Sequence, residues 1–357
     1  MQFANTTQPN VSQNANLDLA TTKCLAVVLA KLTGKNREMR AYQLNDYNVK
    51  AQLCSIPTPE PEVGQVRVKI EACGLNFADL LMMKGQYQEK PALPFIPGME
   101  LAGTVDALGP NVTSPSIGTR VAVFSGQGGL AEYGCFDSRR CVPLPNDMPF
   151  SDAAAFQIAY GTSHMALDHK AGLRAGETLL VLGAAGGVGL TAVQIGKQMG
   201  ARVIACARGP DKLAVAKRAG ADHVVDSDTQ DIREAVKALG GADVVYDPIG
   251  GEQFTSALRA CNPEARILVI GFASGTVPPI PANLLLVKNI SVVGLYWGGY
   301  LKFSPETLTR SMARLFEWYT DGTFKPHISN SFPLDQVDDA FEMLRQRKST
   351  GKVVVTL

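Results

Sequence analysis

Strong net charge, long apolar runs and paired cysteines are all missing from this sequence. Its 357 residues carry 34 lysines and arginines against 33 aspartates and glutamates, a formal net charge of +1. This balance gives no reason to expect a nucleic-acid partner or an anionic membrane surface, and no apolar stretch approaches the length that spans a bilayer. The seven cysteines are scattered, odd in number and free of C-x-x-C pairs. That pattern argues against a disulfide framework and is typical of a reducing compartment, so we expect a cytoplasmic protein.

The first 38 residues differ in composition from the rest of the chain. They are rich in Asn, Gln, Thr and Ala, with one apolar patch at Leu25–Leu32. Asp18 precedes that patch and no basic segment does, which is a poor match to a secretory signal. We therefore predict that residues 1–38 are an extension outside the fold, either disordered or the result of a misassigned start. A transit peptide is the remaining alternative.

Three stretches of different pattern divide the rest of the chain. Residues 39–160 carry short strands separated by Gly, Pro and Asn, and Val66–Ala72 alternates apolar and polar side chains as a half-buried strand does. Residues 161–303 alternate six strands with helices. This alternation predicts an α/β fold with a doubly wound parallel sheet that binds its ligand at the carboxyl ends of the strands. Residues 304–357 end in the strand Lys352–Leu357, which we expect to rejoin the first domain.

A glycine-rich turn is the most informative motif. It follows the apolar run Thr178–Leu182 directly and leads into a helical pattern at Leu190–Met199. Strand, glycine turn and helix in that order begin a dinucleotide-binding βαβ unit. The glycines permit a tight turn and let the backbone approach the pyrophosphate, which lies at the positive N-terminus of the helix. The predicted cofactor-binding residues of the turn are Gly183, Gly186, Gly187, Val188 and Gly189.

The residues after the second strand of this unit indicate which nicotinamide cofactor is bound. An NAD site would place Asp or Glu just past the strand Arg202–Cys206, to hold the ribose 2′-hydroxyl. This chain has Arg208 there instead, with Lys212 shortly after it. Cations suit a 2′-phosphate, so we predict NADPH. The alternative is that both are solvated surface residues.

Five ordered stretches carry a family resemblance: the glycine turn, Ala72–Asp79, Gly85–Tyr87, Ile96–Glu100 and Gln157–Thr162. Together they resemble the medium-chain dehydrogenase/reductase superfamily and, within it, the zinc-independent NADPH:quinone oxidoreductases. The resemblance covers about residues 39–357. It implies a Rossmann NADPH-binding domain over 161–303 and a β-rich GroES-like catalytic domain made of 39–160 and 304–357.

The metal positions of the superfamily decide the branch. Zinc-dependent members place a cysteine three residues before the aspartate that matches Asp79, and a histidine between the matching Gly98 and Glu100. This chain has Asn76 and Met99 at those positions. Neither replaces a thiolate or an imidazole as a zinc ligand. Cys73 is out of register, and the four histidines have no ligand-like companions, so we predict no metal.

The expected chemistry follows from the missing Lewis acid. Quinones and alkenes conjugated to a carbonyl accept a hydride readily without one. The resemblance implies transfer from NADPH to quinones; an ene reductase acting on enones or enoyl thioesters, and a non-catalytic NADPH-binding protein, are the alternatives. Asn76 and Tyr87 are the implied catalytic residues, since both can donate a hydrogen bond to the developing oxyanion. Asn76 as a helix cap and Tyr87 as a half-buried aromatic stay open, and Asp79 is expected to be structural.

Three further segments are implied by the resemblance. Thr162, with Tyr160, resembles the segment that lines the nicotinamide, although a hydroxyl at a helix start is an equal alternative. Gly271 and Phe272 follow the fifth predicted strand, where family members bring backbone close to the nicotinamide ribose, but strand-end geometry also favours glycine. The sixth strand, which ends near Tyr296, pairs across a dimer in the family. A homodimer is therefore expected, with the aromatic residues in either the substrate site or the interface.

Overall fold

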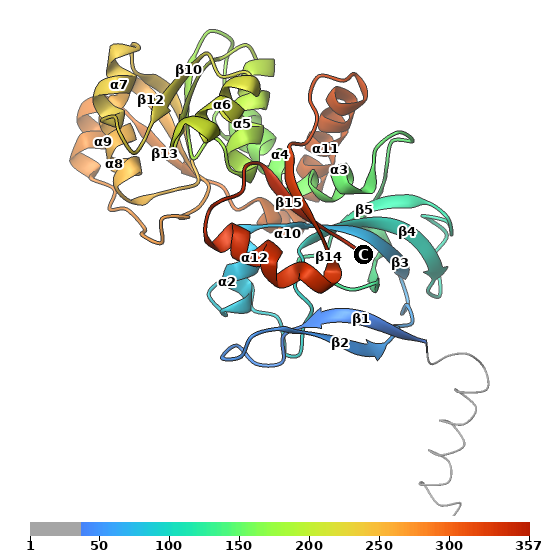
Figure 1. Ribbon diagram of the computed structural model, residues 1–357. Coiled ribbons are helices and arrows are strands. Elements are labelled where there is room, and N and C mark those ends of the chain that lie inside the picture. The colour runs from blue at the N-terminus through green and yellow to red at the C-terminus, as the bar shows by residue number, and fades with distance from the viewer. Residues whose placement is uncertain (1–36) are drawn as a thin grey trace, which may run out of the picture.

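The computed structural model describes residues 37–357, which form two units, each built around one large β-sheet (Figure 1). Of the predicted extension, residues 1–38, all but Arg37 and Glu38 lie outside the described residues. Glu38 begins β1 (Glu38–Gln43), which pairs antiparallel with β2 (Gln52–Pro57).

A parallel six-stranded sheet is the centre of one unit. Its strands lie in the order β10-β9-β8-β11-β12-β13, and every neighbouring pair is parallel. The predicted doubly wound parallel sheet is thereby confirmed. The strand order reverses between β8 and β11, which is where sheets of this kind bind ligands. The strands are β8 (Thr178–Leu182), β9 (Arg202–Ala207), β10 (His223–Asp226), β11 (Ala242–Asp247), β12 (Cys261–Val269) and β13 (Ser291–Gly294).

Helices cover both faces of this sheet because its strands are apolar on both sides. Leu179 and Val181 of β8 pack into one cluster with α4 and α5, whereas Leu180 and Leu182 pack into another with α7 and α8. Such two-sided burial is what a continuous apolar run predicts. The helices are α4 (Gln157–His164), α5 (Gly187–Gln198), α6 (Pro210–Arg218), α7 (Ile232–Ala238), α8 (Gly251–Ala260) and α9 (Ala282–Lys288).

A seven-stranded sheet is the centre of the other unit. Six strands lie in the order β14-β15-β3-β4-β5-β7, and β6 pairs with β3. The C-terminal strand β15 is antiparallel to β3, so the predicted return of the chain end is confirmed. The strands are β3 (Gln65–Leu75), β4 (Glu100–Leu108), β5 (Arg120–Phe124), β6 (Tyr133–Asp137), β7 (Cys141–Pro143), β14 (Ile328–Pro333) and β15 (Lys352–Thr356).

The remaining helices surround this sheet and join it to the parallel one. Figure 1 shows α12 and β15, in red, beside α2 and β3, in blue, so segments far apart in the sequence build one region. These helices are α2 (Phe77–Met83), α3 (Phe150–Ala154), α10 (Tyr300–Phe303), α11 (Pro305–Thr320) and α12 (Val337–Arg345). Within residues 37–357, no helix is long and apolar enough to cross a membrane.

Candidate active site

The glycine turn joins β8 to α5 at the carboxyl end of the strand. The helix begins at Gly187, inside the turn rather than after it. Gly183 has a φ of +57°, a conformation that glycine adopts without strain. A Cβ on Gly189 would lie 2.2 Å from the carbonyl oxygen of Gly183, so only glycine lets the helix approach the strand this closely.

Gly186 has a different reason to be glycine. Its φ is −78°, and a Cβ there would meet only the Gly183 oxygen, at an ordinary 3.4 Å. No packing among the described residues requires glycine here, and the missing side chain leaves space beside the helix N-terminus. Leu190 N makes the first intrahelical bond, to Gly186 O at 2.8 Å, so the N–H groups of residues 187–189 have no helical acceptor. The turn therefore fits the pyrophosphate of a dinucleotide.

Three cations gather where β9 ends. Arg208 follows that strand, and its Nε lies 3.4 Å from Asp228 Oδ1. Lys212 Nζ donates to the carbonyl of Arg347 (2.6 Å), and the Arg347 guanidinium donates to Ala273 O (2.6 Å). Burial lowers the pKa of Lys212, and the charges of Arg208 and Arg347 lower it further. Sequence reasoning identified the first two cations and missed Arg347.

Thr162 lies inside α4 and is buried, so the alternative of a hydroxyl at the helix start is wrong. Tyr160, on the same helix, is a core residue. It stacks on Phe156 with ring centroids 4.5 Å apart, and its hydroxyl donates to Gln194 Oε1 (2.7 Å).

Gly271 and Phe272 lie in the loop that follows β12, at the same edge of the sheet as the glycine turn. A Cβ on Gly271 would meet only Pro248 O, at 3.5 Å, and its φ is not positive. Strand-end geometry therefore does not require this glycine. Phe272 keeps 39% of its surface exposed beside it.

A buried hydrogen-bond network lies where the superfamily's metal positions fall. Lys352 Nζ donates to Asn76 Oδ1 (2.7 Å), Glu100 Oε1 (2.7 Å) and Leu75 O (2.8 Å). Asn76 Nδ2 in turn donates to Glu100 Oε1 (3.0 Å) and Gly74 O (3.2 Å). Both amide hydrogens of Asn76 are used inside the protein, which differs from the free donor that was expected. No motif in the sequence indicated that Lys352 takes part.

Asp79 holds the start of α2, as expected of a structural residue. Its Oδ2 accepts from the N–H of Asn76 (2.8 Å), which is the N-cap residue of that helix. Its Oδ1 accepts from the N–H groups of Gly98 and Met99, each at 3.1 Å. Burial raises the pKa of this carboxyl to about 6, although the hydrogen bonds oppose that shift.

These positions do not fit a zinc ion. The amide of Asn76 and the buried thioether of Met99 supply no thiolate, imidazole or carboxylate. The ammonium of Lys352, which lies 2.7 Å from Asn76 Oδ1, would repel a dication. Burial raises the pKa of Cys73, which favours its neutral thiol. Over residues 37–357 there is no group of three or more His, Cys, Asp or Glu side chains that could hold a metal.

Aromatic side chains from the two units pack on one another in two pairs. Phe124 is the register partner of Glu100 in the β4–β5 ladder and contacts Trp297 edge to face, with ring centroids 4.8 Å apart. Tyr87 packs on Tyr296 in the same way, at 6.4 Å. Burial raises the pKa of the Tyr87 phenol, which therefore stays protonated at neutral pH.

Two buried N–H donors, one on α4 and one packed against it, have no hydrogen-bond acceptor among the described residues: Gln157 Nε2 and Trp297 Nε1. Gln157 begins α4, next to Ile158, whose N–H donates to Glu100 Oε2 (2.9 Å). Trp297 lies against Gly161 of the same helix, where a Cβ would be 2.8 Å from Nε1. An unpaired buried donor is costly, so both positions suit a ligand that brings an acceptor.

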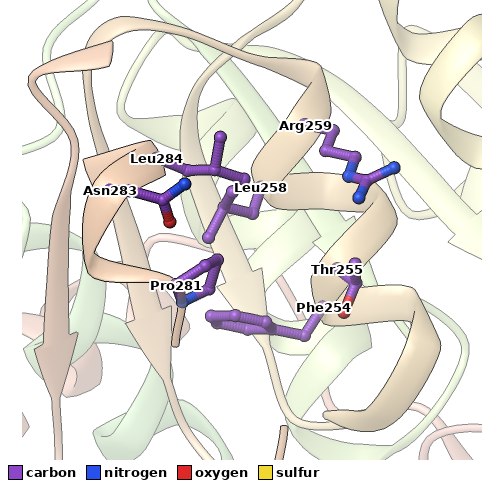
Figure 2. A pocket seen from close by; sticks show the side chains of 7 residues that line it. All are labelled: Phe254, Thr255, Leu258, Arg259, Pro281, Asn283 and Leu284. Carbon is purple, nitrogen blue, oxygen red and sulfur yellow. The ribbon is translucent and has the colours of Figure 1, made fainter. Parts of the chain in front are cut away.

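A separate cavity of about 260 Å³ lies between α8 and α9 (Figure 2). None of the residues that line this cavity belongs to the glycine turn, the cation cluster or the buried network, so the cavity is not part of the candidate active site. The lining residues are Phe254, Thr255, Leu258, Arg259, Pro281, Asn283 and Leu284.

Two family models match separate parts of this chain. Residues 62–146 match the alcohol dehydrogenase GroES-like domain, and residues 187–317 match the zinc-binding dehydrogenase domain.

Relatives and solved structures agree with these matches. A quinone oxidoreductase-like protein 2 homolog of Nematostella vectensis is 45% identical over 82% of this chain and 81% of its own length. A human synaptic vesicle membrane protein VAT-1 homolog is 33% identical over 86% of this chain and 82% of its own length. The quinone oxidoreductase of Thermus thermophilus, reported together with its NADPH complex, is 34% identical with a TM-score of 0.80, covering 89% of this chain and 100% of that chain. The chain therefore belongs to the medium-chain dehydrogenase/reductase superfamily, as an oxidoreductase of the quinone oxidoreductase-like group with a site for a nicotinamide cofactor.

Proposed function

We propose that this protein is an NADPH-dependent reductase that transfers a hydride to quinones without zinc. The observation that carries the proposal is the aromatic junction, in which Phe124 packs on Trp297 and Tyr87 packs on Tyr296, because a planar quinone suits such rings. The names of the Nematostella vectensis relative and of the Thermus thermophilus neighbour support the same substrate class.

NADPH rather than NADH is the proposed cofactor, and when bound it supplies the hydride. The N–H groups of residues 187–189 would hold its pyrophosphate. Three cations suit its 2′-phosphate: Arg208, Lys212 and Arg347. The two guanidinium groups can bind phosphate in a bidentate manner, and the Lys212 ammonium adds a point charge. The proposed contacts of the nicotinamide half are Thr162, Gly271 and Phe272.

Reduction of a quinone to a hydroquinone also needs a proton and a donor for the oxygen on which charge develops. Tyr87 suits the second task, because burial keeps its phenol protonated and able to donate a hydrogen bond. Trp297 Nε1 and Gln157 Nε2 are two further donors that have no acceptor within the described part of the chain. In this proposal Asn76 shapes the site through Glu100 and does not itself bond the substrate oxygen.

Enones and enoyl thioesters are the alternative acceptors. A coenzyme A or phosphopantetheine carrier would need a basic patch at the site. Arg266 instead pairs with Glu177 (2.7 Å) and Lys302 with Glu89 (3.0 Å). Lys288 Nζ donates to three carbonyls at the end of α8. No observation therefore favours a thioester over a free quinone or enone.

The test follows NADPH oxidation by chelator-treated protein, with benzoquinones and naphthoquinones beside enones and enoyl thioesters. We expect fast turnover of quinones and little of the alkenes. A preference for alkenes would make the protein an ene reductase. Tight NADPH binding without turnover of any acceptor would favour a non-catalytic NADPH-binding protein.

We also propose that the protein is a homodimer. The strand β13 ends the parallel sheet, with no neighbour on its outer side within residues 37–357. The adjacent helix α9 leaves Leu286 and Val287 exposed by 77% and 73%. A second copy that pairs along β13 would cover both.

The cytoplasm is the proposed compartment, and the six cysteines in the described part of the chain are all free.

A further inference from the structure

We infer that the ammonium of Lys352 is a built-in cation that replaces the metal of the superfamily: it neutralises Glu100 and fixes the orientation of Asn76. Lys352 is then a positioning residue, acting on the reaction through Asn76 and Glu100. Only the kinetic part of its test rests on the proposed function.

The protein itself supplies an acceptor for every N–H bond of the Lys352 ammonium. Its three N–H bonds have three oxygen acceptors at 2.7–2.8 Å, from Leu75, Asn76 and Glu100. The side chain of Lys352 is 5% exposed and that of Glu100 is fully buried. The second carboxylate oxygen of Glu100 is also satisfied, by the N–H of Ile158 at 2.9 Å.

Charge makes this arrangement necessary. A buried carboxylate without a cation is strongly unfavourable, because burial removes the water that would stabilise it. In the described part of the chain, Lys352 is the only cation within 4 Å of Glu100. A zinc ion beside Asn76 would meet the charge of this ammonium, and it would find oxygen atoms and a thioether in place of the sulfur and nitrogen ligands it prefers.

The ammonium also decides which way the Asn76 amide points. Lys352 can only donate and an ionised Glu100 can only accept, so Oδ1 must face Lys352 and Nδ2 must face Glu100. Removal of the ammonium would free the amide to rotate. Asn76 is the N-cap residue of α2, so a rotated amide would lose its bond to Glu100 at the start of that helix.

The residue before Lys352 is attached to the glycine turn. Gly351 donates its N–H to Ala185 O (2.7 Å) and forms a bridge with Gly186. The stem of Lys352 then passes so close to Gly187 that a Cβ there would lie 3.3 Å from Lys352 Cδ. Gly351 and Lys352 together thus connect the glycine turn to Asn76 and Glu100.

The test compares Lys352→Met, the double variant Glu100→Gln/Lys352→Met, and Lys352→Ala with added ethylammonium or propylammonium. Lys288→Met is the matched control, because that ammonium also donates to three oxygens, all of them backbone carbonyls remote from the site. Metal content, the thermal midpoint, the NADPH dissociation constant, and kcat and KM for a quinone are measured on each.

We expect substoichiometric zinc in the wild type. In Lys352→Met and in the double variant, kcat should fall by about 10- to 100-fold, because a small misplacement of a group in the site has an effect of this size. The double variant should recover most of the thermal midpoint without recovering kcat, because it has no unpaired charge. The alkylammonium ions should restore both quantities to Lys352→Ala, and Lys288→Met should keep wild-type kcat.

If the double variant keeps the wild-type kcat, Lys352 and Glu100 form only a structural ion pair, and the inference fails. One tightly bound zinc ion per wild-type chain would also overturn the inference. If the wild type reduces no acceptor, the proposed function fails. Metal content and the alkylammonium-dependent rise in the thermal midpoint of Lys352→Ala then still decide the inference: no such rise would refute it.

Discussion

Replacing Arg208 by alanine should weaken the binding of NADPH and leave the binding of NADH almost unchanged. Arg208 follows β9, the strand end that lies near the adenosine ribose in sheets of this type. Its side chain is 57% exposed, and its Nε lies 3.4 Å from Asp228 Oδ1. The phosphate of NADPH must therefore compete with a carboxylate for the same guanidinium.

The magnitude follows from that competition. A hydrogen bond to a charged group contributes roughly 1.5–3 kcal/mol, and an exposed ion pair such as Arg208–Asp228 about 0.2–1 kcal/mol. The difference leaves about 1–2 kcal/mol for NADPH, or roughly a 5- to 30-fold rise in Kd when Arg208 is lost. NADH has a hydroxyl in place of the phosphate, so its Kd should change less than about twofold. Asp228→Asn should lower the Kd for NADPH, because it removes the competing carboxylate.

The assay is a calorimetric titration of each variant with NADPH and with NADH at two salt concentrations. Arg314→Ala is the matched control: its side chain is 55% exposed and it pairs with Glu317 at 2.8 Å on α11. The control should leave both dissociation constants unchanged. Equal losses of NADPH and NADH affinity in Arg208→Ala would refute the assignment of the 2′-phosphate to this cluster.

Four further predictions concern other parts of the site and the assembly. Gly189→Ala should lower both the thermal midpoint and the affinity for NADPH, because the added methyl would overlap a backbone carbonyl. Gly186→Ala should lower only the affinity for NADPH. Fluorimetric melts and binding titrations distinguish the two variants. Burial raises the pKa of Asp79 to about 6, above about 3.9 for an unfolded aspartate. The folded state therefore binds the proton more tightly, and the free energy of unfolding should fall by roughly 3 kcal/mol as pH rises from about 4 to about 6. Urea melts should show this fall in the wild type and not in Asp79→Asn. Tyr87→Phe should lower kcat for quinones by about 100-fold with unchanged NADPH affinity, and an unaltered kcat in steady-state assays would remove the phenol from the reaction. Leu286→Asp should shift the proposed dimer toward monomer in sedimentation experiments, and a dimer that persists would contradict an interface over α9.

The features that could be predicted from the sequence are those whose residues lie close together in the chain. The glycine turn is one, because the strand before it, the turn and the helix after it are consecutive. Asp79 is another: an acidic residue three positions after Asn76 is typical of a helix start, and the structure has that contact. In each case one local rule fixes both the residue type and its partner.

Long-range partners explain what could not be predicted. Lys352 reaches Asn76 across 276 positions of sequence, and Lys212 reaches Arg347 across 135. The only local signal for Lys352 was a single cation at the start of an otherwise apolar strand. The Asn76 amide shows the consequence, since its residue type indicated a donor to substrate, but its orientation depends on a lysine that only the fold brings near.

The state of the Lys352 ammonium bears directly on which substrates the site can reduce. A catalytic zinc keeps one coordination position open, and the substrate oxygen is polarised there. The ammonium of Lys352 has all three N–H bonds directed at protein oxygens, so it offers a substrate no such position. An unactivated ketone would therefore lack an electrophilic partner in this network. A quinone needs none, because reduction makes its ring aromatic, and weak donors such as the Tyr87 phenol are sufficient for the developing charge. A saturated ammonium in place of a metal would thus favour acceptors that are already reactive, which is the substrate class we propose.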